Sequence, residues 1–225
     1  CGAGRGGGPV PGGPGPGRTL PLCPAGVRAL AVDPHPQNLA RAGRRAPGVP
    51  LVRARAEALP FRDGAFDTVI STFGVMFTPN QERAASELLR VCRSGGQIGL
   101  TNWTPDGFIG QLFKTLGKYI APPAAAKSPL LWGTRARLTE MFGSAAAWIK
   151  TESRHFNFRY RSSEHFVDVF RTFYGPTLKA FAALDIRKQN ALEKDVFDLI
   201  GRMNKAEDGT MVVPSEYLAV VIMKR

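Results

Sequence analysis

Cysteine and histidine are scarce in this sequence of 225 residues, which contains three of each. Cys1, Cys23 and Cys92 are too few and too scattered for a disulfide framework or a zinc knuckle, so we expect a reducing, cytoplasmic environment. No run of 18 apolar residues is present, and we expect no membrane span. The sequence also has no P-loop, no Ser-His-Asp order and no cluster of metal ligands, which argues against metal catalysis.

Acidic residues are also few, because 18 Asp and Glu stand against 30 Lys and Arg, giving a net charge of +12. Such an excess is typical of many proteins that bind nucleic acid. The 21 Arg and 9 Lys are spread along the chain, however, which favours a solvated surface. An RNA-binding or RNA-modifying protein is kept as an alternative, since the aromatic residues among the positive charges of residues 154–161 could stack on bases. The same alternation also predicts a half-buried strand.

The first 26 residues contain 10 Gly and 6 Pro, a composition that excludes a regular helix or a central strand. We expect an irregular segment over residues 1–26 and one domain over residues 27–225. Within that domain the apolar patterns predict strands at residues 27–33, 49–54, 66–71, 97–103, 150–160 and 217–223. They predict helices at residues 36–47, 78–96, 108–120, 134–142, 163–173, 176–184 and 185–204. This alternation predicts an α/β fold with a doubly wound, mostly parallel sheet and right-handed crossovers.

Two segments near expected strands contain the most specific sequence motifs of the chain. Residues 55–70 read Arg-Ala-Glu-Ala-Leu-Pro-Phe-Arg-Asp-Gly-Ala-Phe-Asp-Thr-Val-Ile, and residues 90–96 read Arg-Val-Cys-Arg-Ser-Gly-Gly. A nucleotide-like ligand binds at the carboxyl ends of the strands in an open α/β sheet. The two segments resemble the class I S-adenosylmethionine (SAM)-dependent methyltransferases, in the ubiquinone/menaquinone-biosynthesis-like branch. The resemblance is strong over residues 28–103 and looser over 104–225, where residues 102–114 and 131–134 resemble an uncharacterised bacterial subgroup.

The resemblance implies a Rossmann-like, seven-stranded sheet and SAM as the cofactor. Residues 150–160 and 216–224 would form the antiparallel pair of strands at its end, and residues 104–148 and 162–205 would be an α-helical, substrate-side insert. Cys1–Gly4 looks like the end of the family's glycine loop, so we expect a chain that is truncated before its first strand. The glycine-rich stretch that follows stands where the family has a helix, and we interpret it as a reading-frame error that resequencing of the coding DNA would test.

The resemblance assigns cofactor contacts to several loops. Asp33 would accept hydrogen bonds from the ribose, and the alternative is that it is a turn residue before Pro34. Arg55 stands where the family has an acid beside the adenine, and a guanidinium cannot accept that bond. The remaining contacts would be Gly2 and Gly4 at the methionine end, Ala56, Glu57 and Leu59 at the adenine, and Phe73 and Gly74 beside the sulfonium. Core packing is the alternative role of Leu59.

A substrate pocket would be built by the insert, with Trp103, Phe108, Trp132, His165, Arg171, Phe173 and Tyr174 as candidates, although each could be a core residue. No motif identifies a catalytic residue, but Glu164 and His165 could supply a general base. The expected function is methyl transfer to a small, partly apolar acceptor, impaired by the truncation. The alternative is an NAD(P)-dependent oxidoreductase, because Gly2-x-Gly4-x-x-Gly7 and Asp33 also match a dinucleotide fingerprint. We expect no nucleic-acid partner.

Overall fold

The structure is a computed structural model that describes residues 28–121 and 127–225. The predicted glycine loop, with Gly2 and Gly4, lies outside the described residues. The strands are β1 (Ala31–Asp33), β2 (Leu51–Arg53), β3 (Phe66–Thr72), β4 (Cys92–Trp103), β5 (Ala146–Tyr160) and β6 (Met211–Lys224). The α-helices are α2 (Pro36–Arg45), α3 (Gln81–Val91), α4 (Phe108–Gly117), α5 (Arg135–Phe142), α6 (Ser163–Phe173), α7 (Gly175–Ala182) and α8 (Ile186–Met203). Two short 3-10 helices are η2 (Val75–Phe77) and η3 (Pro129–Gly133).

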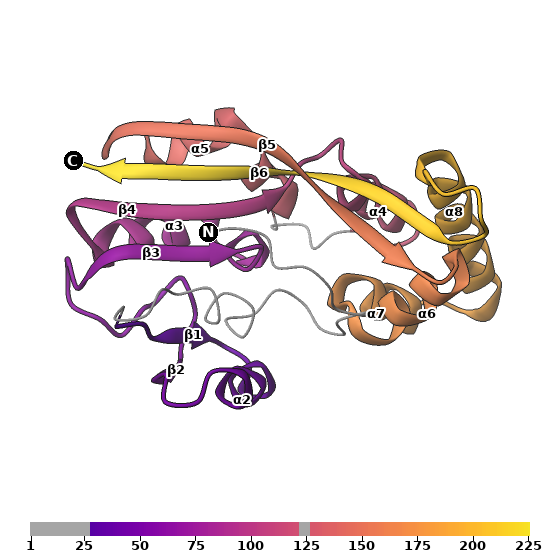
Figure 1. Cartoon of the computed structure of the whole chain (residues 1–225), viewed down its shortest axis with the longest axis horizontal. Helices are drawn as coiled ribbons and strands as arrows, with labels where there is room; N and C mark the ends of the chain where they lie inside the picture. The colour runs from indigo at the N-terminus through magenta and orange to yellow at the C-terminus, as the bar shows by residue number, and fades with distance from the viewer. Residues whose placement is uncertain (1–27, 122–126) are drawn as a thin grey trace.

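The described strands form two sheets. β1 and β2 pair in parallel, and the second sheet has the order β3-β4-β6-β5. In the second sheet β3 and β4 are parallel, while β6 is antiparallel to both β4 and β5. The predicted α/β fold and the antiparallel pair of late strands are therefore confirmed. Figure 1 shows β1, β2 and α2 as a small unit beside the β3 edge of the larger sheet.

Helices α3 and α5 cover one face of the four-stranded sheet (Figure 1). Ile98 and Leu100 of β4 and Ala84 and Leu88 of α3 are buried in the same hydrophobic core. Asn80 is the N-cap of α3, since its side chain accepts a hydrogen bond from the amide of Arg83. Thr134 caps α5 in the same way, by accepting from the amide of Arg137.

Some predicted boundaries are wrong. Helix α3 ends at Val91 rather than at Gly95 and Gly96, because Cys92 already pairs with Phe66 and begins β4. Gly95 does adopt a positive φ of 68°, but within the strand. Strand β6 begins at Met211, six residues before the predicted start at 217, since β5 and β6 remain paired from Tyr160↔Met211 onward. The first predicted strand is also shorter, with only Ala31–Asp33 in β1.

The β5–β6 ribbon extends beyond the sheet, and α4, α6, α7 and α8 gather around its far end (Figure 1). Ser215 of β6 anchors this end because its hydroxyl accepts a hydrogen bond of 3.1 Å from the amide of Ile109 in α4. Strand β4 and η3 also pack tightly together. A Cβ on Gly133 would lie 2.1 Å from the carbonyl oxygen of Trp103, so only glycine fits at this contact. Among the helices of the described residues, none has the length and apolarity to cross a bilayer.

Candidate cofactor site

Asp33 is the last residue of β1 and is held rigidly. Only 7% of it is exposed. Its Oδ1 accepts a hydrogen bond of 2.8 Å from the amide of His35, and both carboxylate oxygens lie 3.2 Å from Nδ2 of Asn38. Because Asn38 is in the first turn of α2, the start of that helix fixes the carboxylate at the end of the strand. The turn role and the ligand role considered for Asp33 are therefore compatible, since each oxygen can accept more than one bond.

The bend after β2 lies at the same edge as Asp33. Asp33 pairs with Arg53, and Arg55 follows two residues later, which is about 7 Å along an extended chain. The bend is closed by the amide of Ala58, which donates to the carbonyl of Arg55 at 3.1 Å. Arg55 turns its guanidinium toward Glu57, with Nη2 and Oε1 3.3 Å apart, and the side chain of Glu57 is only 11% exposed. The register thus places the bend at residues 55–58 at the same edge of the sheet as Asp33. The role of Asp33, Ala56 and Glu57 in binding a cofactor stays a prediction.

Helix α3 braces the next part of the loop. Oε2 of Glu87 accepts a hydrogen bond of 2.7 Å from the amide of Leu59. Arg90 donates to the carbonyls of Leu59 (2.9 Å) and Phe61 (2.6 Å) and lies 2.9 Å from the carboxylate of Asp63. Glu87 and Arg90 also bond each other at 2.7 Å. These bonds hold the backbone of residues 59–63 against the helix.

The charges of this brace stabilise each other. Hydrogen bonds from Arg90, together with the amide of Leu59, lower the pKa of Glu87 to about 2, against the opposing effect of burial. The same pair raises the pKa of Arg90. Sequence reasoning missed this role of Glu87 and Arg90. The available signal was their spacing of three residues on one helix, which places both side chains on one face.

Phe73 follows β3 in an unusual backbone conformation. It has a φ of 58°, a left-handed value that is uncommon for a bulky residue. Its amide donates to the carbonyl of Thr101 in β4 at 2.9 Å. Its ring is stacked on that of Trp103, with centroids 4.1 Å apart and an interplanar angle of 17°. Phe73, Gly74 and Trp103 therefore share the carboxyl ends of β3 and β4, where the sequence predicts the reactive end of the site.

The other predicted substrate contacts come from α4, η3 and the end of α6. Phe108 and Trp132 are fully buried in the core. Arg171 of α6 bonds Gln189 of α8 at 2.7 Å and covers the ring of Phe181. The hydroxyl of Tyr174 is buried, which raises its pKa, and Phe173 is 45% exposed on the same helical end. Phe108 and Trp103 both contact the ring of Phe158, at 5.8 and 5.7 Å. The role of these residues in binding an acceptor stays a prediction.

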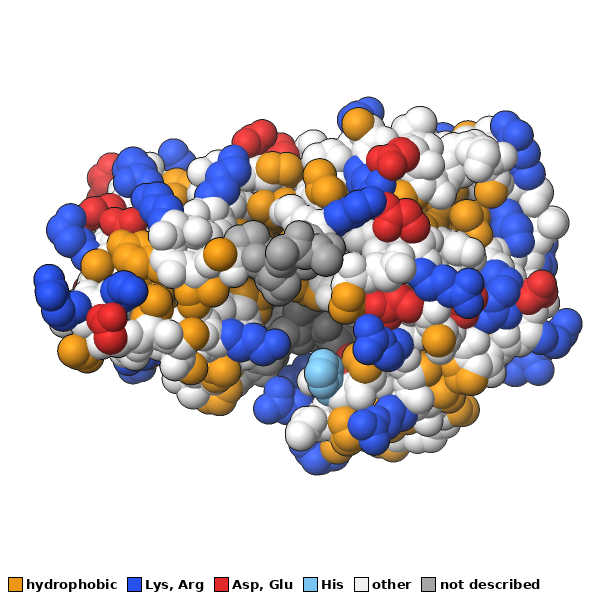
Figure 2. Space-filling model, turned by 180° about the vertical axis from the view of Figure 1, so that it is seen from behind, with side chains coloured by type: hydrophobic (Ala, Val, Ile, Leu, Met, Phe, Trp, Pro, Cys, Tyr) orange, Lys and Arg blue, Asp and Glu red, His pale blue; other side chains and the backbone are white. Residues whose placement is uncertain are grey.

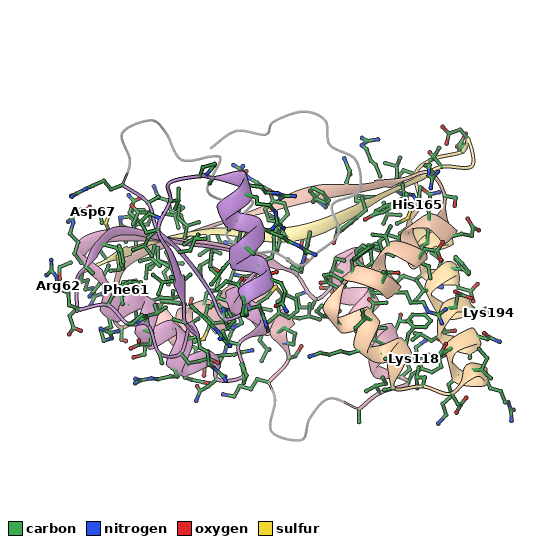
Figure 3. The ribbon with its side chains drawn as sticks, turned by 90° about the horizontal axis from the view of Figure 1, so that it is seen from below. Phe61, Arg62, Asp67, Lys118, His165 and Lys194 are labelled. Atoms are coloured by element: carbon green, nitrogen blue, oxygen red, sulfur yellow. The ribbon has the colours of Figure 1, made fainter. Side chains whose placement is uncertain are left out.

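The two candidates for a general base are on α6. Glu164 is exposed, and a hydrogen bond from Ser162 lowers its pKa, which makes it a weaker base. His165 packs edge-on against Tyr160, with ring centroids 5.5 Å apart. Figure 3 shows His165 at the opposite end of the molecule from Phe61 and Arg62. Their catalytic role also stays a prediction.

The positive charge of the chain is spread over its surface. Figure 2 shows Lys and Arg side chains scattered over one whole face rather than aligned in one stripe. Within residues 28–121 and 127–225, no three His, Cys, Asp or Glu side chains lie close enough together to hold a metal ion. Polar contacts are concentrated around Asp33 and around residues 55–63.

Known proteins are similar to this chain in sequence. The family profile described as a methyltransferase domain matches residues 11–100. An uncharacterised protein of Mycobacterium tuberculosis is 36% identical over 214 residues, which cover 92% of this chain and 77% of that protein. An uncharacterised protein of Mycobacterium bovis is 39% identical over 172 residues, 74% of this chain, and the match spans 63% of that relative's length.

Two further similarities carry an assigned activity. A demethylmenaquinone methyltransferase of Renibacterium salmoninarum is 32% identical over 88 residues, which are 39% of this chain and 37% of that protein. Among solved structures, a SAM-dependent methyltransferase of Thermotoga maritima has a TM-score of 0.54 at 16% identity. The match covers 94% of this chain and 79% of that one. The structural similarity supports the fold alone.

Proposed function

This chain belongs to the class I SAM-dependent methyltransferases, and we propose that it transfers the methyl group of its cofactor to a small, partly apolar molecule. The observation that supports this proposal is the position of Asp33 beside the bend at residues 55–58. A rigid carboxylate and a closed backbone bend lie at the carboxyl ends of two adjacent parallel strands, the place where open α/β sheets bind nucleotides.

The described residues fit the adenosine half of SAM. Asp33 can accept from ribose hydroxyls with the lone pairs that His35 and Asn38 leave unused. Glu57, the neighbour that Arg55 contacts, replaces the missing acid as the acceptor for the adenine amino group. The half-buried side chain of Leu59 would lie beside the base. The loop that would hold the methionine half falls outside the described residues.

The cofactor supplies an activated methyl group, so the protein has mainly to bind and orient the acceptor. In-line transfer requires the accepting atom about 3 Å from the methyl carbon and aligned with the bond that breaks. Phe73 and Trp103 form an apolar wall at the ends of β3 and β4, which can exclude water and bury part of an acceptor. This wall supports an acceptor that is partly apolar.

Calorimetric titration with S-adenosylhomocysteine, the demethylated cofactor, tests the proposal. Charge-assisted hydrogen bonds contribute roughly 1.5–3 kcal/mol each, so Asp33→Ala should weaken binding by about 10- to 150-fold. Asn38→Ala is the matched control, because it removes an amide that contacts Asp33 but keeps the carboxylate. We expect its dissociation constant to stay within about threefold of the unsubstituted chain.

A second titration, with NADH in place of S-adenosylhomocysteine, tests the oxidoreductase alternative, for which the same carboxylate would bind a ribose. The proposal predicts that NADH produces no saturable signal. Saturable binding of NADH together with no binding of S-adenosylhomocysteine would replace methyl transfer by hydride transfer as the preferred function.

A further inference from the structure

We propose that a second copy of this chain docks on the open face of the four-stranded sheet and forms a weak dimer with two-fold symmetry. The open face is the side of the sheet that α3 and α5 do not cover. The proposal rests on the packing of the sheet and not on the proposed function. The face has three rows of paired residues: Thr68, Gln97, Met223 and Trp148; Ile70, Gly99, Val221 and Lys150; and Thr72, Thr101, Ala219 and Glu152.

Strand pairing determines which side chains share this face. Ile70 pairs with Gly99, Gly99 pairs with Val221, and Val221 pairs with Lys150, so one row crosses all four strands. Directly paired residues project to the same face, and residues two apart along each strand supply the other two rows. Ile98, the neighbour of Gly99, is fully buried in the core on the opposite face.

Large apolar side chains are exposed on the open face. Ile70 is 56% exposed, Val221 is 38% exposed and Trp148 is 36% exposed. None of the residues in the three rows is buried. Figure 1 looks onto this face, with α3 and α5 behind the strands. A sheet face in water normally presents polar side chains, so the exposed apolar groups indicate a surface that another polypeptide covers.

The centre of the open face has no charge. Only Lys150 and Glu152 of the three rows are ionised, and both are on β5, an edge strand of the sheet. Charged residues are 21% of the whole chain, so their absence from the three other strands of this face is a local depletion. An uncharged centre with a charged rim is typical of protein interfaces. A nucleic acid or an anionic lipid surface would instead require clustered positive charge.

The charges on the rim favour a second copy as the partner. Along β5 the side chains on this face alternate in sign, because Arg154 follows Lys150 and Glu152. A two-fold axis between two facing sheets, perpendicular to the strands and level with residue 151, places β5 antiparallel to β5. Lys150 of each copy then faces Glu152 of the other, so the same ion pair forms twice. A partner with one sign of charge could not match both side chains.

The same axis matches the remaining side chains of the two copies. It places Val221 of one copy opposite Ala219 of the other, so that a larger side chain meets a smaller one. It also places Trp148 opposite Arg154, a ring opposite a guanidinium. Gly99 has no side chain and leaves room beside Ile70 for a group from the facing sheet. Packed sheets lie about 10 Å apart, which requires such interdigitation.

The size of the open face sets the expected strength of the dimer. Four strands about 4.8 Å apart, and about 20 Å of each strand, give a footprint of about 400 Å² on each copy. The two copies together would bury about 800 Å², which is below the area of stable complexes. We therefore expect a reversible dimer with a dissociation constant of about 10–100 μM.

Sedimentation equilibrium of the whole chain, from about 2 to about 300 μM, brackets that dissociation constant. Ile70→Lys and Val221→Lys each place a charge in the uncharged centre, and each should weaken the dimer by roughly tenfold or more. Ile186→Lys is the matched control, because Ile186 is 67% exposed at the start of α8, outside the open face. A chain that is monomeric throughout, or a dimer that neither lysine variant weakens, would overturn the proposal.

Charge reversal tests the two-fold arrangement. Lys150→Glu and Glu152→Lys should each weaken the dimer by roughly fivefold, whereas the double variant should regain most of the loss because the paired charges only exchange places. Lys179→Glu, at an exposed position of α7, controls for the change in net charge. A double variant as weak as either single variant would contradict the facing of Lys150 and Glu152.

Alkylation by iodoacetamide reports directly on the coverage of the face. An Ile70→Cys variant should react several-fold more slowly at high than at low protein concentration. A Leu131→Cys variant should react at the same rate at both, since Leu131 is 37% exposed on η3, outside the open face. Slow reaction of the Ile70→Cys variant at every concentration, in a chain that sediments as a monomer, would assign the face to another segment of the same chain and overturn the second copy as its occupant.

Discussion

Glu87 is a buried side chain whose titration contributes to the pH dependence of this fold. Its folded-state pKa of about 2 lies below the ordinary value of 4.5, so its contribution to stability is present above pH 4.5 and is lost as the pH falls toward 2. We expect Glu87→Gln to lower the free energy of unfolding by about 2 kcal/mol at pH 7. Urea unfolding from pH 7 to pH 3 should show this difference shrinking below pH 4.5.

Glu193 provides the control for that experiment. It lies 3.8 Å from Arg171 in a partly exposed pair, which contributes little. Glu193→Gln should change the free energy of unfolding by less than about 0.5 kcal/mol at every pH. A Glu87→Gln difference that stays constant between pH 7 and pH 3 would contradict the assignment of the low pKa to the contact with Arg90.

Phe73 permits a separate test of backbone strain. Asparagine tolerates the left-handed region better than alanine, and neither has an aromatic ring. Both Phe73→Asn and Phe73→Ala should therefore lose the stack on Trp103, but the alanine variant should be less stable by about 1 kcal/mol. Urea unfolding of the two variants measures the difference. An alanine variant as stable as the asparagine variant would show that the φ of 58° carries no strain.

Sequence reasoning located part of the site at this scale. Asp33 and the bend at 55–58 were predictable because a strand followed by an acid, and a second strand followed by a turn, both have local signatures. The ring contacts that Phe156 and Tyr217 make with Trp103 were not predictable. Their alternation indicates only a half-buried strand, and their contact with Trp103 depends on the register between strands that are distant in the sequence.

At the scale of elements, one buried hydroxyl contributes to the docking of α4 onto β6. Ser215 is fully buried and accepts from the amide of Ile109 near the start of α4. Ser215→Ala would leave that buried amide without this partner, so we expect a loss of about 1–2 kcal/mol in the free energy of unfolding. Urea unfolding measures it. Ser153→Ala, on the exposed part of β5, should have an effect below about 0.5 kcal/mol. Equal effects of the two would argue against the anchor.

Most helices were predictable because they have both an apolar face and a cap. Asn80, Thr134 and Asp185 each accept a hydrogen bond from an amide three residues later, and these caps precede α3, α5 and α8. The end of α3 was not predictable from local signals. Gly95 and Gly96 are typical of a helix end, but pairing of Cys92 with Phe66 begins β4 earlier. Tertiary hydrogen bonding therefore outweighs the local preference.

At the scale of the whole molecule, the charge of +12 predicts general attraction to polyanions without a dedicated surface. Scattered cations release few counterions at any one place, so binding to mixed RNA in 150 mM salt should be weaker than about 10 μM. Filter binding between 20 and 200 mM salt measures it. A sub-micromolar dissociation constant at 150 mM salt would favour the RNA-binding alternative.

The contact between Gly133 and Trp103 limits how this family of sequences can diverge. Any side chain at position 133 would overlap the backbone of the strand that carries the indole, and the overlap involves main-chain atoms that no rotamer change can relieve. This glycine can be replaced only if β4 and η3 shift apart. Random mutagenesis followed by selection for folded protein should therefore recover glycine at position 133 and varied residues at the exposed position 131.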